Sequence, residues 1–90
     1  MKGRITARII DEERGLVTLE KVKAVRIRSK RYVLLIMNDY APTIGDVEGD
    51  VSFMTADDET TLRGVDGYFK HLNNEFTLIV KSYQKENTEA

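Results

Sequence analysis

Apolar and polar residues alternate at every second position through most of this chain, and this pattern constrains the fold more than any other feature. Ile5, Ala7 and Ile9 alternate with polar residues near the start, and residues 76–80 repeat the pattern near the end. Because successive side chains of a β-strand point to opposite faces, a period of two predicts half-buried strands. No segment has a convincing 3.6-residue period of an amphipathic helix. We therefore expect an all-β protein.

Turn-forming residues divide the chain into short pieces. Gly15 interrupts the first pattern, Pro42 lies in a polar turn region, and Asn73-Asn74 separates two strand patterns. Asparagine tolerates positive φ, so the Asn pair predicts a two-residue hairpin turn. The apolar parity reverses near Ala24, which predicts a bulge or a break there. The spacing predicts a small flattened β-sandwich or barrel of about eight to ten short, mostly antiparallel strands.

Two segments carry more specific expectations. Residues 60–65 and 67–72 read as separate strands on either side of a glycine-rich bend. Residues 32–37 are apolar without interruption, and a strand that is apolar on both faces is predicted to be buried on both sides.

The length and the rare residue types limit the chemistry. Ninety residues predict one domain, which we place at 1–81, followed by a polar, frayed tail at 82–90. There is no cysteine and a single histidine, which excludes disulfides, thiolate metal sites, a cysteine nucleophile and multi-histidine metal centres. His71 lacks a visible orienting partner and is interpreted as a surface or rim histidine. We expect no catalytic residue, no cofactor, no metal and no small-molecule substrate, hence no enzyme.

Membrane and targeting signals are not evident in the sequence. The uninterrupted apolar run at 32–37 is far shorter than the roughly 20 residues that span a bilayer. The start of the chain has a basic charge but no apolar segment of the kind found in signal peptides. We expect a cytoplasmic protein without direct membrane insertion.

Charge is unevenly distributed along the chain although the net charge is only −1. Residues 1–36 carry ten basic and four acidic side chains, whereas residues 37–90 carry four basic and eleven acidic ones. Either the domain has one basic and one acidic face, or strands from the two halves interleave and the charges pair across the sheet. We favour interleaving, because small antiparallel folds mix distant segments.

The basic residues of segment 21–31 suggest one alternative function. The candidates for nucleic-acid binding are Arg26, Arg28, Lys30 and Arg31. Small β-barrels bind single strands through a basic groove with stacking aromatic rings, which Tyr32, Tyr40 and Tyr68 would have to supply. The net acidic chain and the lack of aromatic residues among the basic ones disfavour nucleic acid.

Four stretches in a fixed order carry a family resemblance over roughly residues 4–81. They are Leu35-Ile36-Met37-Asn38-Asp39-Tyr40-Ala41-Pro42-Thr43, Glu48-Gly49, Val65-Asp66-Gly67-Tyr68-Phe69 and Asn74-Glu75-Phe76-Thr77-Leu78-Ile79. This order resembles the N-terminal β-sandwich domain of the ATP synthase epsilon subunit. Tyr40 stands where that family has a histidine, and Tyr68 stands where it has a second glycine. The family's C-terminal helical hairpin has no counterpart in these 90 residues.

The resemblance implies a flattened β-sandwich and a non-catalytic protein-interaction module. The implied contact residues are Asn38, Asp39, Tyr40, Pro42 and Thr43, in the loop that faces the rotor ring in the family. The departures favour a stand-alone relative with another protein partner over a truncated epsilon-type subunit that binds rotor subunits. The oligomeric state stays open, because the edge strands of a β-domain without cross-links have to be covered or protected, and a second copy is one way to do this.

Overall fold

A computed structural model describes the backbone of residues 4–88 and the side chains as far as Lys81. The described chain is all β, as the alternating pattern predicts, and it contains seven strands. They are β1 (Ile5–Asp11), β2 (Gly15–Val22), β3 (Ala24–Ser29), β4 (Val33–Met37), β5 (Thr43–Met54), β6 (Glu59–Leu72) and β7 (Glu75–Thr88).

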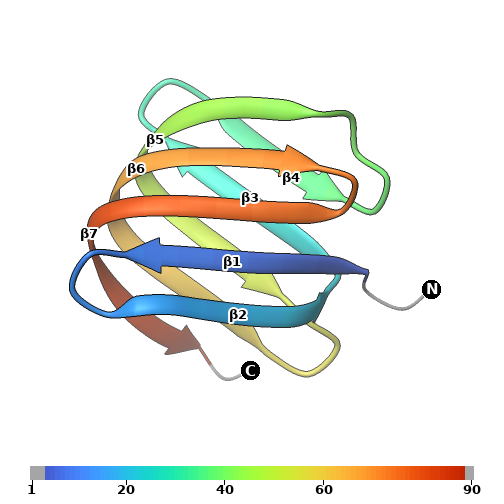
Figure 1. Cartoon of the computed structure of the whole chain (residues 1–90), viewed down its shortest axis with the longest axis horizontal. Helices are drawn as coiled ribbons and strands as arrows, with labels where there is room; N and C mark the ends of the chain where they lie inside the picture. Colours follow the sequence, from blue (N-terminus) through green and yellow to red (C-terminus); the bar gives the residue numbers. More distant parts are fainter. Residues whose placement is uncertain (1–3, 89–90) are drawn as a thin grey trace.

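The strands form one sheet that folds over into two layers (Figure 1). The order is β2-β1-β7-β6-β5-β3-β4, and every neighbouring pair is antiparallel except the parallel pair β1–β7. The front layer contains β2, β1 and one half of each of β7, β6 and β5. The back layer contains the other halves of these three strands together with β3 and β4. The strands of the two layers cross, and β2 and β4 end the sheet order.

Strands β5, β6 and β7 belong to both layers because they bend. Register shifts mark the bends between Gly49 and Val51 and between Arg63 and Gly67. The backbones approach closely there, and a Cβ at Gly49 or Gly67 would collide with a carbonyl oxygen of the neighbouring strand. The bends explain why the structure has seven strands and not the predicted eight to ten. Residues 60–65 and 67–72, predicted as two strands, are two parts of β6.

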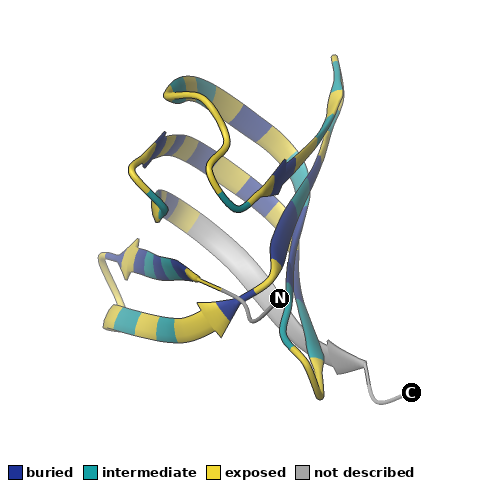
Figure 2. Cartoon of the chain, turned by 90° about the vertical axis from the view of Figure 1, so that its right-hand side faces the viewer, coloured by how far each residue is buried: buried dark blue, intermediate teal, exposed yellow. Residues whose placement is uncertain are grey.

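Buried residues recur along the strands of both layers (Figure 2), and their side chains form one core cluster. Phe76 lies at its centre, 5.7 Å from Phe69 and 5.9 Å from Phe53 between ring centroids. The aliphatic residues of the core are Ile5, Ala7, Ile9, Val22, Val25, Ile27, Ile36, Val47, Val51, Leu62, Val65, Leu78 and Val80. These residues come from all seven strands, so each strand contributes to one shared core.

Two of the predicted turns are confirmed by the backbone. Asn73 and Asn74 have φ of 51° and 60°, as the two-residue β6–β7 hairpin requires. The parity change near Ala24 corresponds to Lys23, which lies between β2 and β3 and separates a front-layer strand from a back-layer strand. Just before it, β2 bulges opposite Ile5 and Ala7, and Lys21 has φ of 59°.

The prediction that residues 32–37 are buried on both faces is wrong for the single chain. β4 ends the sheet order, and Val33, Leu35 and Met37 expose 70%, 44% and 53% of their surface. Only Ile36 is fully buried in this strand. The residues are apolar on both faces, as the sequence indicates, but within the described chain no layer covers the outer one.

The segment predicted as a frayed tail is a strand over most of its length. β7 continues to Thr88, and its backbone pairs with residues 59–63 of β6. A polar sequence is compatible with such a strand, because backbone hydrogen bonds hold it. Residues 89–90 lie outside the described chain.

Candidate interaction surfaces

The β4–β5 connection, residues 38–42, is fixed to the rest of the molecule by its neighbours. The backbone N–H of Asp39 donates to Oδ1 of Asn74 at 2.7 Å, and Nδ2 of Asn74 donates to Oδ1 of Asp39 at 3.1 Å. The N–H of Arg4 donates to Oδ1 of Asn38 at 3.2 Å. We call residues 38–43 the corner loop. It contains the five sequence-predicted contact residues, together at one end of the sandwich beside the β6–β7 turn (Figure 1).

Within the corner loop, Tyr40 packs on one side and is exposed on the other. Its N–H donates to the carbonyl oxygen of Met37 at 3.2 Å, which closes the turn after β4. Its ring meets His71 edge to face, with 6.4 Å between ring centroids. Tyr40 as a residue is 36% exposed, and Pro42 in the same loop is exposed as well. A tyrosine held in one position with a free outer side suits contact with a protein.

His71, beneath the corner loop, is buried and not at a rim, which corrects the sequence interpretation. It is only 1% exposed, and neither ring nitrogen has a hydrogen-bond partner in the described chain. Strand alternation explains the position, because His71 follows Phe69 by two residues and faces the same core. Burial lowers the pKa of His71 below the ordinary histidine value. The neutral imidazole packs against Phe76 at 6.3 Å between ring centroids.

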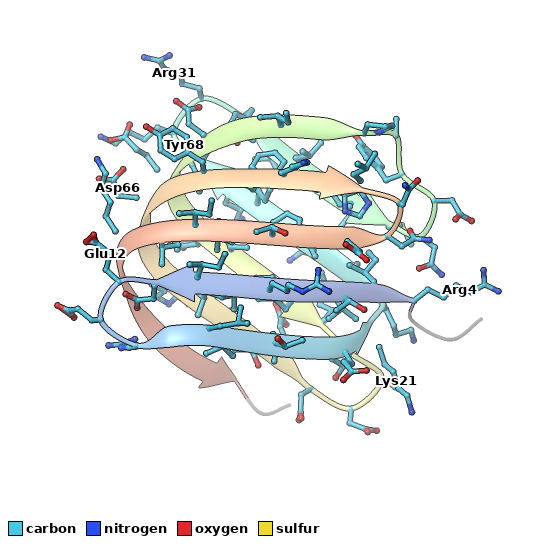
Figure 3. The ribbon with its side chains drawn as sticks, viewed as in Figure 1. Arg4, Glu12, Lys21, Arg31, Asp66 and Tyr68 are labelled. Atoms are coloured by element: carbon cyan, nitrogen blue, oxygen red, sulfur yellow. The ribbon has the colours of Figure 1, made fainter. Side chains whose placement is uncertain are left out.

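The basic candidates Arg26, Arg28, Lys30 and Arg31 lie along β3 and its hairpin turn. Register places Arg28 opposite Val33 and Asp50, and Nζ of Lys30 lies 3.9 Å from Oε2 of Glu48. Arg31 projects at the tip of the hairpin (Figure 3). Acidic neighbours therefore accompany two of the four basic residues. Nucleic-acid binding through this segment stays a prediction.

Of the three tyrosines proposed for base stacking, Tyr68 lies in the other layer from the basic residues of β3, whereas Tyr32 follows Arg31 in the same hairpin. Tyr68 is on the outer face of the front layer (Figure 3), whereas Arg26 and Arg28 are in the back layer. The hydroxyl of Tyr32 donates to the backbone carbonyl of Asp46 at 2.5 Å. Burial, and then the Asp46 charge, raise the pKa of Tyr32.

Two ion pairs support the interleaved reading of the charge distribution, whereas Arg14–Asp11 and Arg63–Asp50 each lie within one half of the sequence. Nη1 of Arg8 lies 3.2 Å from Oε1 of Glu75, which joins β1 to β7. The pair Lys30–Glu48 likewise joins a basic first-half residue to an acidic second-half residue. Charges separated in the sequence are thus brought together by the sheet order.

An exposed apolar row crosses the outer face of the front layer, and sequence reasoning missed it. Its members are Leu16, Ile10, Ile79 and Tyr68, which lie directly opposite one another on β2, β1, β7 and β6. They are 61%, 41%, 51% and 58% exposed, respectively. The only sequence signal is Ile10 and Ile79, which place an apolar residue where the alternation calls for a polar one. Their adjacency depends on the parallel β1–β7 pair, which no local pattern predicts.

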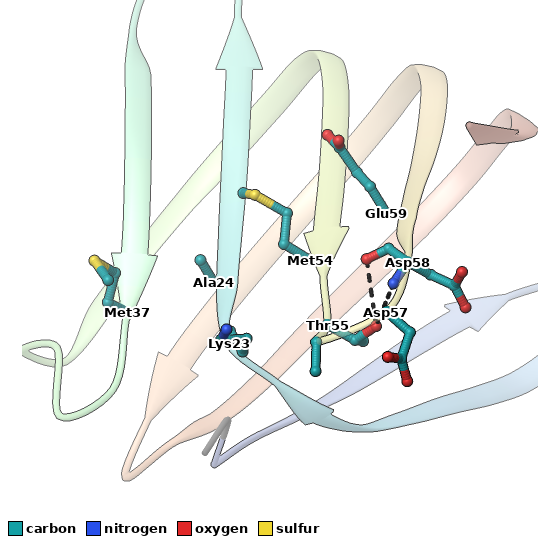
Figure 4. Close-up of a pocket in the computed structure, with 9 residues that line it drawn as sticks. Lys23, Ala24, Met37, Met54, Thr55, Asp57, Asp58 and Glu59 are labelled. Carbon is teal, nitrogen blue, oxygen red and sulfur yellow. Dashed lines mark hydrogen bonds between the residues drawn. The ribbon is translucent and has the colours of Figure 1, made fainter. Parts of the chain in front are cut away.

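A shallow pocket of about 430 Å³ opens on the back layer where β4 ends (Figure 4). Its floor is the row Met37–Ala24–Met54, formed by directly opposed positions of three strands. Lys23 lies beside one part, and the β5–β6 turn residues Thr55, Ala56, Asp57, Asp58 and Glu59 surround the rest. Among residues 4–81, whose side chains are described, no cluster of three or more acidic or histidine side chains is arranged to hold a metal ion.

Comparison with known proteins gives a likeness in fold. No family model matches the sequence, and no curated protein matches it. A chain from the Tetrahymena thermophila mitochondrial ATP synthase structure of the central stalk and c-ring matches 92% of this chain, with a TM-score of 0.71 and 12% identity. A chain from the Euglena gracilis mitochondrial ATP synthase structure with OSCP, F1 and c-ring matches 92%, with a TM-score of 0.74 and 12% identity.

At 12% identity these matches establish a shared fold and nothing finer. This chain spans 67% of the Tetrahymena chain and 54% of the Euglena chain. The structure contains no membrane-spanning helix within residues 4–88.

Proposed function

We propose that this chain is a non-catalytic protein-interaction module of the kind that the ATP synthase epsilon subunit has at its N-terminus. The observation that carries the proposal is the fold likeness over 92% of the chain to chains from two mitochondrial ATP synthase structures. The motif order around Ala41-Pro42 and Gly67 supports the epsilon assignment. Tyr40 and Tyr68, which depart from the family pattern, favour a stand-alone relative over a truncated subunit.

The corner loop is the proposed docking site. Its hydrogen bonds to Asn74 and Arg4 hold the backbone before a partner arrives, so little conformational entropy is lost on binding. Tyr40 offers a large amphipathic ring, and tyrosine is enriched among the residues that dominate binding energy. The apolar row on the front layer provides a second surface that a partner could cover.

An affinity capture from native cytosolic and membrane fractions tests the proposal. The tagged chain is incubated at low and at high salt, and the retained proteins are identified by mass spectrometry. Recovery of ATP synthase rotor subunits at both salt concentrations supports an epsilon-type role. Recovery of one other protein supports a stand-alone module if the Tyr40→Ala variant recovers less of that protein. Salt-sensitive recovery of nucleic acid alone would contradict the proposal and favour the basic segment, because counterion release drives such binding.

Two matched variants distinguish the two surfaces. Tyr40→Ala should weaken capture about tenfold, as loss of an aromatic anchor does, while thermal unfolding shows that the domain remains folded. Tyr68→Ala removes the same kind of side chain from the apolar row and tests that surface separately. Loss of capture with Tyr68→Ala alone would move the docking site to the row. Unchanged capture with both variants would show that neither the corner loop nor the apolar row binds the captured protein.

A further inference from the structure

Strand β4 presents an apolar edge that the single chain leaves uncovered. Its outward side chains Val33, Leu35 and Met37 are all exposed, and β3 is its one strand neighbour in the described sheet. The sequence of this strand has the composition of one buried on both faces. The disagreement between composition and exposure points to a covering strand from another molecule.

Several of the protective devices that natural edge strands use are missing from β4, although the strand is short, with five residues. The strand contains no charged residue, no proline and no glycine, and its register with β3 has no bulge. Edge strands of monomeric proteins normally carry such features, because an unprotected edge pairs with other strands.

We propose that β4 pairs antiparallel with β4 of a second copy of this chain, about a two-fold axis through Leu35. Val33 then lies opposite Met37 of the second copy, and Leu35 lies opposite its own equivalent. The two sheets become continuous across the axis. This homodimer goes beyond the proposed docking function and does not depend on it.

The backbone of β4 is arranged for this register. The N–H of Ser29 donates to the carbonyl oxygen of Tyr32 at 2.9 Å in the β3–β4 hairpin. Because hydrogen-bonding direction alternates along a strand, Leu34 and Ile36 also direct their peptide groups toward β3. The peptide groups of Val33 and Leu35 and the N–H of Met37 therefore face the free edge, while the carbonyl oxygen of Met37 accepts from Tyr40. A two-fold axis at Leu35 places these same three positions opposite one another, as hydrogen-bonded antiparallel pairs require.

Side chains on both faces of β4 complement themselves in this register. On the outer face, Val33, Leu35 and Met37 meet only one another. On the inner face, half-buried Leu34 lies opposite Ile36 of the second copy. Apolar cross-strand pairs of this kind stabilise antiparallel sheets.

Charges at the two ends of β4 complement each other in the same register. Arg31 lies in the hairpin bend before β4, and Asp39 lies in the turn after it. Both residues are exposed in the single chain. Antiparallel pairing about the two-fold axis brings the basic end of each β4 beside the acidic end of the other. Charge complementarity thus favours a second copy over a general apolar partner.

Sedimentation equilibrium of the full chain tests the dimer, with protein from micromolar to millimolar concentration. We expect the mass to rise from 10.3 kDa toward twice that value. Leu35→Lys places two ammonium groups together on the axis and should hold the mass at one chain at every concentration. Leu16→Lys changes an exposed leucine on β2, the other terminal strand, and should leave association unchanged. A monomeric wild-type chain at millimolar concentration, or a dimer that survives Leu35→Lys, would overturn the proposal.

Cross-linking tests the register, and no native cysteine competes with the introduced one for disulfide formation. Residues in a hydrogen-bonded antiparallel pair have Cα atoms about 5.5 Å apart, within the range that a disulfide spans. Mild oxidation of the Leu35→Cys variant should therefore give a covalent dimer in high yield. The control Leu16→Cys should cross-link at most slowly. Equal cross-linking of both variants would indicate random collision and contradict the register.

A charge reversal provides the last test. Arg31→Asp should raise the dimer dissociation constant about tenfold, because it brings two like charges together at each end of the shared edge. The neutral variant Arg31→Ala should raise the constant by less than the reversal does. Equal dissociation constants for the wild type and Arg31→Asp would contradict the charge contact between the two ends.

Discussion

The two terminal strands of the sheet, β2 and β4, differ in almost every property that governs an edge. β2 carries Glu20 and Lys21, has a bulge opposite Ile5 and Ala7, and places Lys21 at positive φ. β4 is regular, uncharged and apolar on both faces. A bulge and charges discourage further pairing, and a regular apolar edge invites it. The comparison teaches that one edge of this sheet is built to remain single and the other is built to be covered.

The two strands also differ in how deeply their inward side chains are buried. Shortening these side chains should have the largest effect on stability. Ile36 in β4 is fully buried, whereas Leu19 in β2 is half-buried. We expect Ile36→Ala to lower the free energy of unfolding by about 3 kcal/mol and Leu19→Ala by about 1 kcal/mol. Urea denaturation in a Leu35→Lys background measures this for single chains. Equal losses would show that β4 is no better anchored to the core than β2.

The bulge in β2 can be tested through its backbone. Lys21 has φ of 59°, which β-branched residues adopt only with strain. Lys21→Ile should therefore lower the free energy of unfolding by about 1–2 kcal/mol, although the site is exposed. Lys21→Gly is the control and should be at least as stable as the wild type. An isoleucine variant of wild-type stability would mean that the bulge relaxes and that β2 is less protected than its geometry indicates.

Acid should destabilise the end of the sandwich where the corner loop follows β4 and covers His71. Burial lowers the pKa of His71 below the ordinary value of 6.5, so the unfolded chain takes up this proton at higher pH than the folded chain. Stability from this group is complete above pH 6.5 and is lost as the pH falls toward the lower folded pKa. His71→Phe should remove this loss, measured by urea denaturation between pH 8 and pH 5. A pH profile unchanged by the substitution would contradict the buried, unpartnered state of His71.

The smallest effect is expected beside β2, on the front layer. Arg8 and Glu75 form an ion pair at 3.2 Å, but their side chains are 39% and 60% exposed. Arg8→Ala should lower the free energy of unfolding by at most about 0.5 kcal/mol, because solvent screens the pair. Thermal unfolding at low and high salt measures it. A loss of several kcal/mol would mean that the β1–β7 junction depends on charge more than on packing.

Local patterns predicted much of the fold because they report on local geometry. The alternation at residues 5–9, the turn at Asn73-Asn74 and the break at Lys23 all follow from one strand or one turn. The bends at Gly49 and Gly67 were harder, because a glycine within a strand pattern is compatible with a chain break or a continuous bent strand. The structure has the continuous form, and the sequence pattern predicted two separate strands.

Site prediction depended on whether neighbours in space were neighbours in sequence. The corner loop is one segment, so its five residues could be named together. The apolar row contains one residue from each of four strands, and the hydrogen bonds that hold Asp39 come from Asn74. The burial of His71 depends on the opposite layer. Each of these needs the sheet order, which the amino-acid pattern alone does not determine.

The parallel pair β1–β7 sets an order of events when the chain folds. β1 lies between β2 and β7, so the β1–β2 hairpin, made from residues 5–22, meets the rest of the sheet only through residues 75–80. An isolated two-stranded hairpin is marginally stable in water. The β1–β2 hairpin therefore waits for β7, and contacts of such long sequence separation make folding slow. During this interval Ile5, Ala7 and Ile9 are uncovered, and dilution or a chaperone should raise the yield of folded protein.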